Sequence, residues 1–209
     1  MRDPIARSRE IRRRLDHPVI DSDGHLVEFL PAVREHVQEL AGSQVAAGFD
    51  QYLKTNELAR RLSPDEQRAR GLFRMTWWGF PARNSRDRAS ALLPGLLHER
   101  LPEFGIDFSV LYPTFGLGSV GLPDAELRQS VTRAFNAYFA EATAPYRDRL
   151  CPVAMIPMHT PEEALAELDF AVREQGFRAA CLAGFVRRPL EQPGAPRAAA
   201  WLDSFGPES

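Results

Sequence analysis

After residue 105 the sequence alternates between two kinds of segment. Mostly apolar runs occur at 108–112, 150–157 and 177–185. Segments with apolar residues three and four positions apart separate these runs, at 124–142 and 160–175. Continuously apolar strands that alternate with amphipathic helices are typical of a parallel sheet with helices packed on it. The pattern therefore predicts an α/β fold built from repeated strand–helix units.

The amino-terminal part of the chain adds one more predicted strand and a long interruption. A strand is expected at about 18–25, after a basic and polar arm at 1–17 that is either a short helix or a loose segment. Amphipathic spacing predicts helical structure at about 30–72 and again at 89–104. Ser63 and Thr160 each precede a Pro and have Glu three residues later, so a capping box is expected at both helix starts.

Composition excludes several classes of partner. The 209 residues are 44% hydrophobic and 26% charged, with a formal net charge of -2. A charge this small argues against nucleic acid or a membrane surface as the partner, and no apolar run approaches the roughly 18 residues of a spanning helix. Cys151 and Cys181 fall in predicted strands and read as buried thiols rather than a disulfide. We therefore expect a cytoplasmic protein with one large core.

The first predicted strand ends in a cluster of polar side chains. Asp21, Asp23 and His25 follow one another at spacings of two, with Gly24 expected to let the backbone open out as the strand ends. Side chains alternate faces along a strand, so the three should point the same way. A carboxylate and an imidazole converging at a strand end can hold a divalent metal. The plainer alternative is a turn, with His25 in a structural role.

A second functional interpretation fits the same residues. They resemble the Asp-x-Asp-Gly-Thr nucleophile loop of haloacid-dehalogenase-type phosphatases, with His25 in place of the Thr. Such an enzyme would also need a downstream Lys and a pair of acids after a later strand. Lys54 is the only lysine, and no acidic pair follows the last predicted strand. The phosphatase interpretation is therefore a remote alternative.

The segment 73–84 differs from its surroundings because it has neither a strand nor a helix period. It contains Trp77 and Trp78 among further aromatic residues, together with Arg, Gly and Pro. Aromatic loops near a strand end can line a small-molecule pocket. The alternative, which the sequence leaves equally open, is that the two tryptophans anchor a long loop on the core.

Several short motifs from Pro18 onward occur together in a specific order. They are Ile20-Asp21-Ser22-Asp23-Gly24-His25, Trp77-Trp78-Gly79 with Pro81 and Asn84, Asp87-Arg88-Ala89, Gly105-Ile106-Asp107, Val110-Leu111-Tyr112-Pro113-Thr114, Arg133-Ala134-Phe135-Asn136 and Pro145-Tyr146-Arg147-Asp148-Arg149-Leu150. In this order they resemble the amidohydrolase-related family. That family comprises metal-dependent hydrolases of TIM-barrel fold, and one of its branches includes aminocarboxymuconate-semialdehyde decarboxylase.

The resemblance implies a (β/α)8 barrel of which this chain has about the first four units. Residues 1–17 would be an amino-terminal arm and 18–209 a partial barrel, with an insertion at 30–104. A barrel of this kind has eight strands and usually about 250 residues. We therefore expect either a piece of a longer protein or a short protein in its own right.

The resemblance also implies one divalent metal ion. The family's first strand usually ends in His-x-His, and here Asp23 and His25 stand at those two positions. With one oxygen and one nitrogen donor, zinc, manganese, iron and magnesium all stay open. Asp21 is expected to hydrogen-bond the site rather than bind the metal. The family's catalytic His and Asp come from later strands, so the catalytic residues of this chain stay unknown. Only His159 is placed to reach the site, and as a His that flanks a helix beside Thr160 it needs no functional role.

Two hypotheses follow. In the first, the chain is a metal-dependent hydrolase or decarboxylase acting on a small carboxylated or cyclic organic substrate. Arg83 or Arg88 could then pair with a substrate carboxylate, and the pocket would be shaped by Trp77, Trp78, Arg83, Tyr112 and Thr114. In the second, the chain is an inactive half-barrel whose open strand edges need another copy or a separate carboxyl-terminal half.

Overall fold

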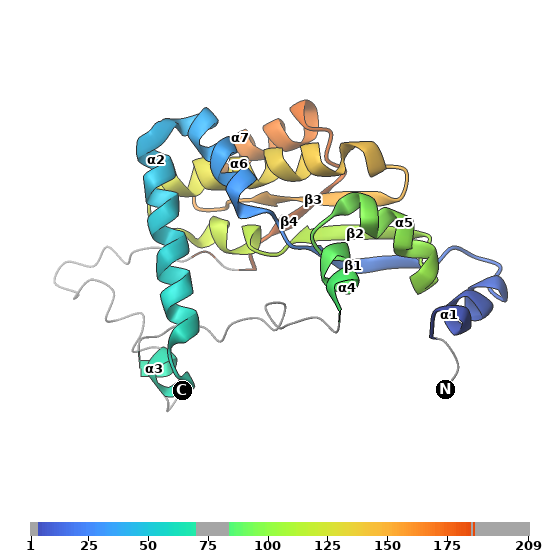
Figure 1. Ribbon diagram of the computed structural model, residues 1–209. Coiled ribbons are helices and arrows are strands. Elements are labelled where there is room, and N and C mark those ends of the chain that lie inside the picture. The colour runs from blue at the N-terminus through green and yellow to red at the C-terminus, as the bar shows by residue number, and fades with distance from the viewer. Residues whose placement is uncertain (1–3, 70–83, 185, 187–209) are drawn as a thin grey trace.

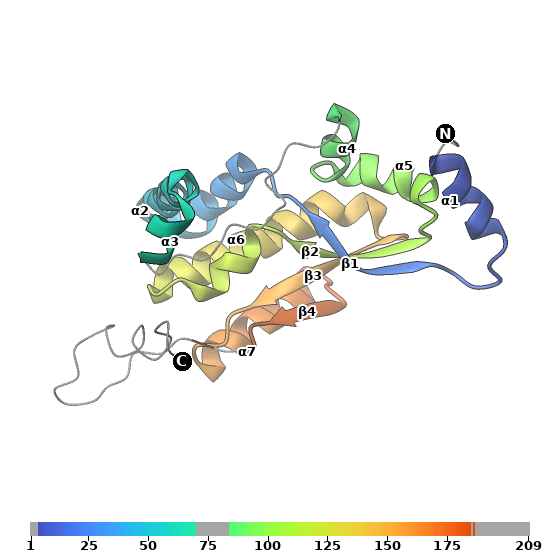
Figure 2. The same ribbon diagram turned by 90° about the horizontal axis from the view of Figure 1, so that it is seen from below.

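The computed structural model describes residues 4–69, 84–184 and 186, and it places four parallel strands side by side (Figures 1 and 2). They are β1 (Ile20–Leu26), β2 (Phe108–Pro113), β3 (Leu150–Ile156) and β4 (Ala179–Leu182), in spatial order β1-β2-β3-β4. Parallel neighbours require a crossover, and a helix lies in each of the three connections. The predicted α/β repeat is confirmed.

Helices α6 (Ala125–Thr143) and α7 (Pro161–Asp169) cover one face of this sheet (Figures 1 and 2). The main core lies between that face and the helices. Leu111 on β2 and Ala154 on β3 are among its strand residues, and Phe135 and Phe139 are among those that α6 contributes. Alternation along β3 turns its other side chains away from this core, toward what would be the inside of a barrel.

A long helix, α2 (Leu30–Arg61), follows β1 and packs against α6. It bends at Gly42, whose φ of 82° lies in the left-handed region that glycine adopts without strain. Beyond the bend the helix runs past the sheet to α3 (Pro64–Ala69), as Figure 1 shows. The capping box predicted at Ser63 is present: its amide and hydroxyl donate to Glu66 at 2.8 and 2.7 Å.

The amino-terminal arm is a helix, α1 (Pro4–Arg13), that packs against α5 (Pro94–Phe104). Arg12 Nε lies 2.6 Å from Oδ2 of Asp107, and the same carboxylate oxygen accepts the amide of Val19 at 2.7 Å. One carboxylate thus joins the arm, the start of β1 and the segment that leads into β2.

Two element boundaries differ from those predicted. The single helix expected at 89–104 is divided into α4 (Ser85–Ser90) and α5, because Leu93 precedes a proline and is held extended, with φ -114° and ψ 105°. The last strand, expected at 177–185, has only the four residues of β4. The two cysteines are less buried than predicted: Cys151 and Cys181 are half-buried free thiols.

A buried ion pair joins α6 to the start of α7. The guanidinium of Arg128 donates to both carboxylate oxygens of Glu163, at 2.7 and 3.0 Å, and both side chains are buried. Thr160 caps α7 as predicted, accepting the amide of Glu163 at 3.2 Å. The expectation that Glu163 reaches back to Thr160 is wrong, because Arg128 engages both oxygens of that carboxylate.

A second buried polar contact ties α6 to the sheet. The side-chain amide of Asn136 donates to the carbonyl of Met155 and accepts its N–H, both at 2.8 Å. Backbone pairing between β2 and β3 ends at Leu111 and Pro152. The Asn136 side chain therefore bonds the N–H and carbonyl of a β3 residue that lies beyond its pairing with β2. The same Asn136 donates to Glu167 at 2.7 Å, and burial raises the pKa of that carboxyl.

We predict that Arg128→Ala lowers the free energy of unfolding by about 3–5 kcal/mol, because it leaves Glu163 buried without a cation. Urea unfolding followed by circular dichroism measures the loss. The matched control is Arg173→Ala, which removes an exposed pair with Asp169 and should change stability by less than about 0.5 kcal/mol. Equal losses in the two variants would contradict the prediction.

We also predict that the contact of α1 with Asp107 weakens in acid. The Val19 amide, and then Arg12, hold the pKa of Asp107 below its usual range. A lowered carboxyl pKa contributes stability at neutral pH that is lost as the pH falls through the folded-state value. The Val19 amide resonance should therefore titrate with a midpoint below that of an ordinary Asp, and Asp107→Asn should abolish the titration. A resonance that titrates unchanged in Asp107→Asn would contradict this assignment.

Candidate metal centre

The end of β1 does not follow the regular alternation expected of it. In its pairing with β2, Asp21 lies opposite Ser109 and Gly24 opposite Leu111. Between these two pairs β1 advances by three residues and β2 by two, which is the signature of a β-bulge in β1. An extra residue reverses the face on which the preceding side chains lie. The expectation that Asp21, Asp23 and His25 share one face is therefore wrong.

Asp21 lies on the same side of the sheet as Ser109. Its Oδ2 accepts the Ser109 hydroxyl at 3.1 Å, and its Oδ1 accepts the backbone amide of Asp23 at the same distance. A Cβ on Gly24 would lie 2.4 Å from the Ser109 hydroxyl and 2.9 Å from Asp21 Oδ2. Glycine is needed here for this close approach rather than for opening the strand, which continues to Leu26.

His25 lies on the opposite face of the sheet, on the same side as Tyr112 of β2. Gly24 and Leu26 on either side of it are buried, whereas His25 is half-buried and Asp23 is exposed. The His25 ring lies 5.9 Å from the ring of Tyr112, which β2 places directly across from it. Asp23 and His25 thus stand at the carboxyl edge of the sheet, where ligands bind in parallel α/β folds.

Thr114 lies beside the His25 imidazole and influences which of its two ring nitrogens carries the proton. Its hydroxyl donates to the carbonyl of Leu26 at 2.9 Å and lies 3.5 Å from Nδ1 of His25. Because the hydroxyl proton is directed at Leu26, the oxygen can accept a proton from Nδ1. This arrangement favours the tautomer in which Nε2 carries the lone pair, the form in which an imidazole binds metal.

Glu28 is a feature of this edge to which the sequence pattern gave no role. It follows β1, and only 2% of its surface is exposed. Its carboxylate accepts the amides of Phe115 and Gly116, at 2.9 and 3.0 Å. Burial raises its pKa, an effect that these backbone hydrogen bonds partly offset. The only sequence signal is its spacing, because Glu28 lies two residues after Leu26 and four after Gly24; that all three are buried is seen only in the structure.

The other predicted site residues divide into two groups. His159 is half-buried between β3 and the cap of α7, which puts it at the same edge of the sheet, and Arg88 is exposed on α4. Their roles stay predictions. Trp77, Trp78 and Arg83 lie outside the described residues.

Within the described ranges, no three His, Cys, Asp or Glu side chains form a group that could hold a metal ion. The candidate centre therefore consists of two donors, Asp23 and His25. One carboxylate and one imidazole suit a divalent cation, but most protein metal sites use three or more ligands. We expect these two residues to bind a metal weakly unless further donors join them.

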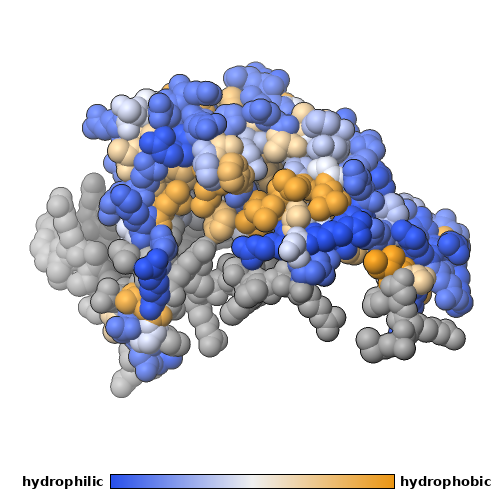
Figure 3. Space-filling model, viewed as in Figure 1, coloured by the Kyte–Doolittle hydropathy of each residue, from blue (hydrophilic) through white to orange (hydrophobic). Residues whose placement is uncertain are grey.

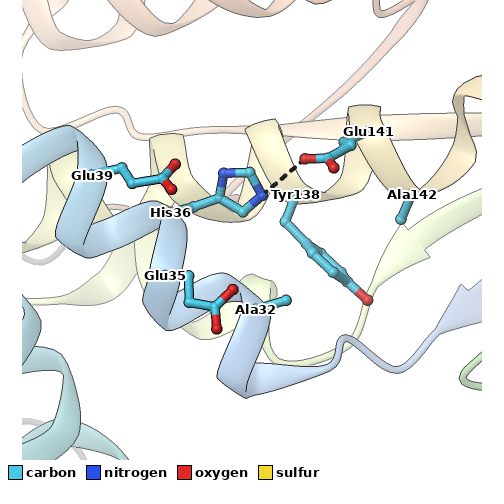
Figure 4. Close-up of a pocket in the computed structure, with 7 residues that line it drawn as sticks. All are labelled: Ala32, Glu35, His36, Glu39, Tyr138, Glu141 and Ala142. Carbon is cyan, nitrogen blue, oxygen red and sulfur yellow. Dashed lines mark ion pairs between the residues drawn. The ribbon is translucent and has the colours of Figure 1, made fainter.

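A separate hollow of about 430 Å³ lies between α2 and α6, on the outer helical layer (Figure 4). His36 Nε2 there lies 3.2 Å from Glu141 Oε2, and the dashed line in Figure 4 marks this pair. Glu35, Glu39 and Tyr138 also line the hollow. Neither Asp23 nor His25 contributes to it, so it is distinct from the candidate centre.

Comparison with known families identifies the class of protein. A family model described as amidohydrolase matches residues 20–203, so the chain belongs to the amidohydrolase family. This agrees with the four parallel strands and the helices that connect them in the described part of the chain. A comparison with curated protein sequences gave no match. No helix in the described part of the chain is long and apolar enough to cross a membrane.

Among solved structures, the chain is similar to 5-carboxyvanillate decarboxylase from Novosphingobium aromaticivorans, in a complex with manganese and 4-hydroxy-3-methoxy-5-nitrobenzoic acid. The TM-score is 0.54 at 17% identity, covering 84% of this chain and 44% of that one. A 2,6-dihydroxybenzoate decarboxylase from Rhizobium gives a TM-score of 0.46 at 20% identity, covering 85% and 42%. The chain thus spans less than half the length of these two enzymes, and it shares part of the fold of the first.

We predict that Gly24→Ala lowers the free energy of unfolding by about 1–3 kcal/mol, because the new methyl would overlap the Ser109 hydroxyl. Ser109→Ala should partly restore stability in the double variant. The carbonyl of Val110, 2.9 Å from the methyl position, would keep the rescue incomplete. Thermal and urea unfolding measure both effects.

The matched control is Gly121→Ala, where an added Cβ meets nothing within 4 Å. Its stability should change by less than about 0.5 kcal/mol. Gly24→Ala with the stability of that control would show that the contact at Ser109 is not restrictive.

Proposed function

We propose that this chain carries the first-strand half of the active site of a metal-dependent hydrolase or decarboxylase. The observation that carries the proposal is the pair of donors, Asp23 and His25, at the carboxyl edge of β1, with Thr114 beside His25 Nδ1. The family to which the chain belongs and the barrel fold of its structural neighbour support this assignment.

In this proposal Asp23 and His25 hold a divalent metal, through a carboxylate oxygen and through Nε2. Water, substrate or residues beyond the described ranges would complete the coordination. Once bound, the metal would lower the pKa of a water molecule or polarise a substrate carboxylate. Manganese is the first ion to test, because the structural neighbour contains it; zinc, iron and magnesium share this donor chemistry.

The chain's own residues would orient the ligand and part of the substrate. Thr114 holds the His25 ring, and Tyr112 stands beside it as a flat, partly apolar wall. Such a wall suits a planar organic molecule. A small aromatic carboxylate is therefore the first substrate class to screen, and it matches the kind of ligand bound in the structural neighbour. Hydrolysis and decarboxylation would use the same donors.

A second candidate is a half-barrel that functions only with another chain. Leu165 on α7, Val172 on the helical turn that continues it, and Leu182 on β4 are apolar residues with exposed side chains. Their exposed fractions are 65%, 49% and 55%. In the described part of the chain, β4 pairs on one side only. Figure 3 shows that apolar side chains also form a band on the face seen in Figure 1. Sedimentation at rising concentration would test this candidate, and a strictly monomeric, catalytically active chain would exclude it.

We predict that the purified chain binds about one Mn²⁺ and that Asp23→Ala/His25→Ala abolishes this binding, because the two donors are lost together. Isothermal titration calorimetry measures the stoichiometry, and size exclusion confirms that both proteins are folded. The control is His36→Ala/Glu141→Ala, which removes a His–carboxylate pair that lines the hollow between α2 and α6 and should bind Mn²⁺ like the wild type. Binding lost in the control but kept in the first variant would overturn the assignment.

A further inference from the structure

We infer that Glu28 is a positioning residue for the candidate metal centre: it acts through the turn at 114–116 to hold Thr114 against His25. The inference rests on the proposed function and adds to it a residue that touches neither metal nor substrate. It follows from contacts between the end of β1 and the turn that leads from β2 into the short 3-10 helix η2 (Gly116–Gly121).

The first step is that Glu28 fixes backbone, not side chains. Its two carboxylate oxygens accept the amides of two consecutive residues, Phe115 and Gly116, at the start of η2. A carboxylate with 2% exposure is costly to bury unless its oxygens are hydrogen-bonded. Both amides also lie at a helix start, where they lack helical acceptors. Each group therefore satisfies the other, and the path of the turn is set.

The second step is that the backbone of the turn is closely packed at Gly116. A Cβ on Gly116 would lie 3.0 Å from Pro113 Cβ, 3.1 Å from Glu28 Oε1 and 3.2 Å from the Phe135 ring. The backbone is thus pressed between the carboxylate and the core. We therefore expect a change in the Glu28 side chain to shift this closely packed backbone.

The third step connects the turn to the imidazole. Thr114 directly precedes Phe115, and its hydroxyl donates to the Leu26 carbonyl at 2.9 Å while lying 3.5 Å from His25 Nδ1. The end of β1 therefore holds the turn at two points, through the Leu26 carbonyl and through the Glu28 carboxylate. If the carboxylate point is loosened, the Thr114 oxygen moves relative to Nδ1, and the preference for a lone pair on Nε2 is lost.

A purely structural role for Glu28 makes a different prediction. Glu28 attaches the end of β1 to the turn before η2, and the neighbouring Phe29 amide donates to the Tyr138 hydroxyl on α6 at 3.1 Å. If stabilising this junction were the whole role, replacing Glu28 would lower stability without changing the state of His25. The tautomer of His25 is therefore the observable that separates the two roles.

The experiment compares Glu28→Gln, Thr114→Val and their double variant with the wild type, all in the absence of metal. Gln is isosteric but can accept only one of the two amides, and Val removes the hydroxyl while leaving the Glu28 contacts in place. Long-range ¹H–¹⁵N spectra of the imidazoles, recorded where His25 is neutral, report the tautomer. Glu167→Gln is the control, because it alters another buried carboxylate that is bonded to Asn136 rather than to the turn.

We expect Glu28→Gln and Thr114→Val each to raise the Nε2–H tautomer of His25. The double variant should shift it no further than the larger single change, because the two residues act in series. Mn²⁺ affinity should fall by about tenfold or more in each variant, the usual cost of losing a partner that orients a ligand. Glu167→Gln should leave the His25 tautomer and the affinity unchanged.

The inference is overturned if Glu28→Gln folds and leaves the His25 tautomer as in the wild type. Where Glu28→Gln does not fold, Thr114→Val still decides, since an unchanged tautomer there removes the route from Glu28 to His25. Additive shifts in the double variant would also refute a serial arrangement. A wild-type chain that binds no Mn²⁺ but shows the tautomer response would overturn the proposed function and leave the role of Glu28 supported.

Discussion

The parallel pairing of β1 with β2 is the constraint on which the rest of the arrangement depends. It joins Ile20 to Phe108 and His25 to Tyr112, residues that lie 88 and 87 positions apart in the sequence. Parallel pairing aligns the carboxyl ends of both strands at one edge, so the donors of β1 meet Thr114 just after β2. An antiparallel pairing would have put these residues at opposite edges of the sheet.

The sequence predicted those parts of the fold in which burial is continuous. β3 and α6 were expected within a residue or two of their observed bounds, because their apolar patterns are long and uninterrupted. The break before α5 was missed, since a single Pro at residue 94 outweighed the leucine pattern on both sides of it. Propensity summed over a window does not detect an effect confined to one peptide unit.

The candidate site was predictable to a smaller extent, for a related reason. Asp23 and His25 are neighbours in sequence, and the motif named them without reference to the rest of the molecule. The bulge that turns Asp21 to the other side depends on the register with β2, which the β1 sequence does not contain. Glu28 was missed because its partners, the amides of Phe115 and Gly116, lie 87 and 88 residues away.

The separation between β1 and β2 also has a consequence for how the protein is made. During synthesis at roughly 5–20 residues per second, Phe108 is added on the order of ten seconds after Ile20. β1 therefore leaves the ribosome long before its partner exists, and closing so long a loop is slow because its entropy must be lost before the pairing is gained. The units from β2 onward are connected locally and can form first. This order would leave Asp23 and His25 to reach their positions beside Thr114 only when β1 pairs with β2.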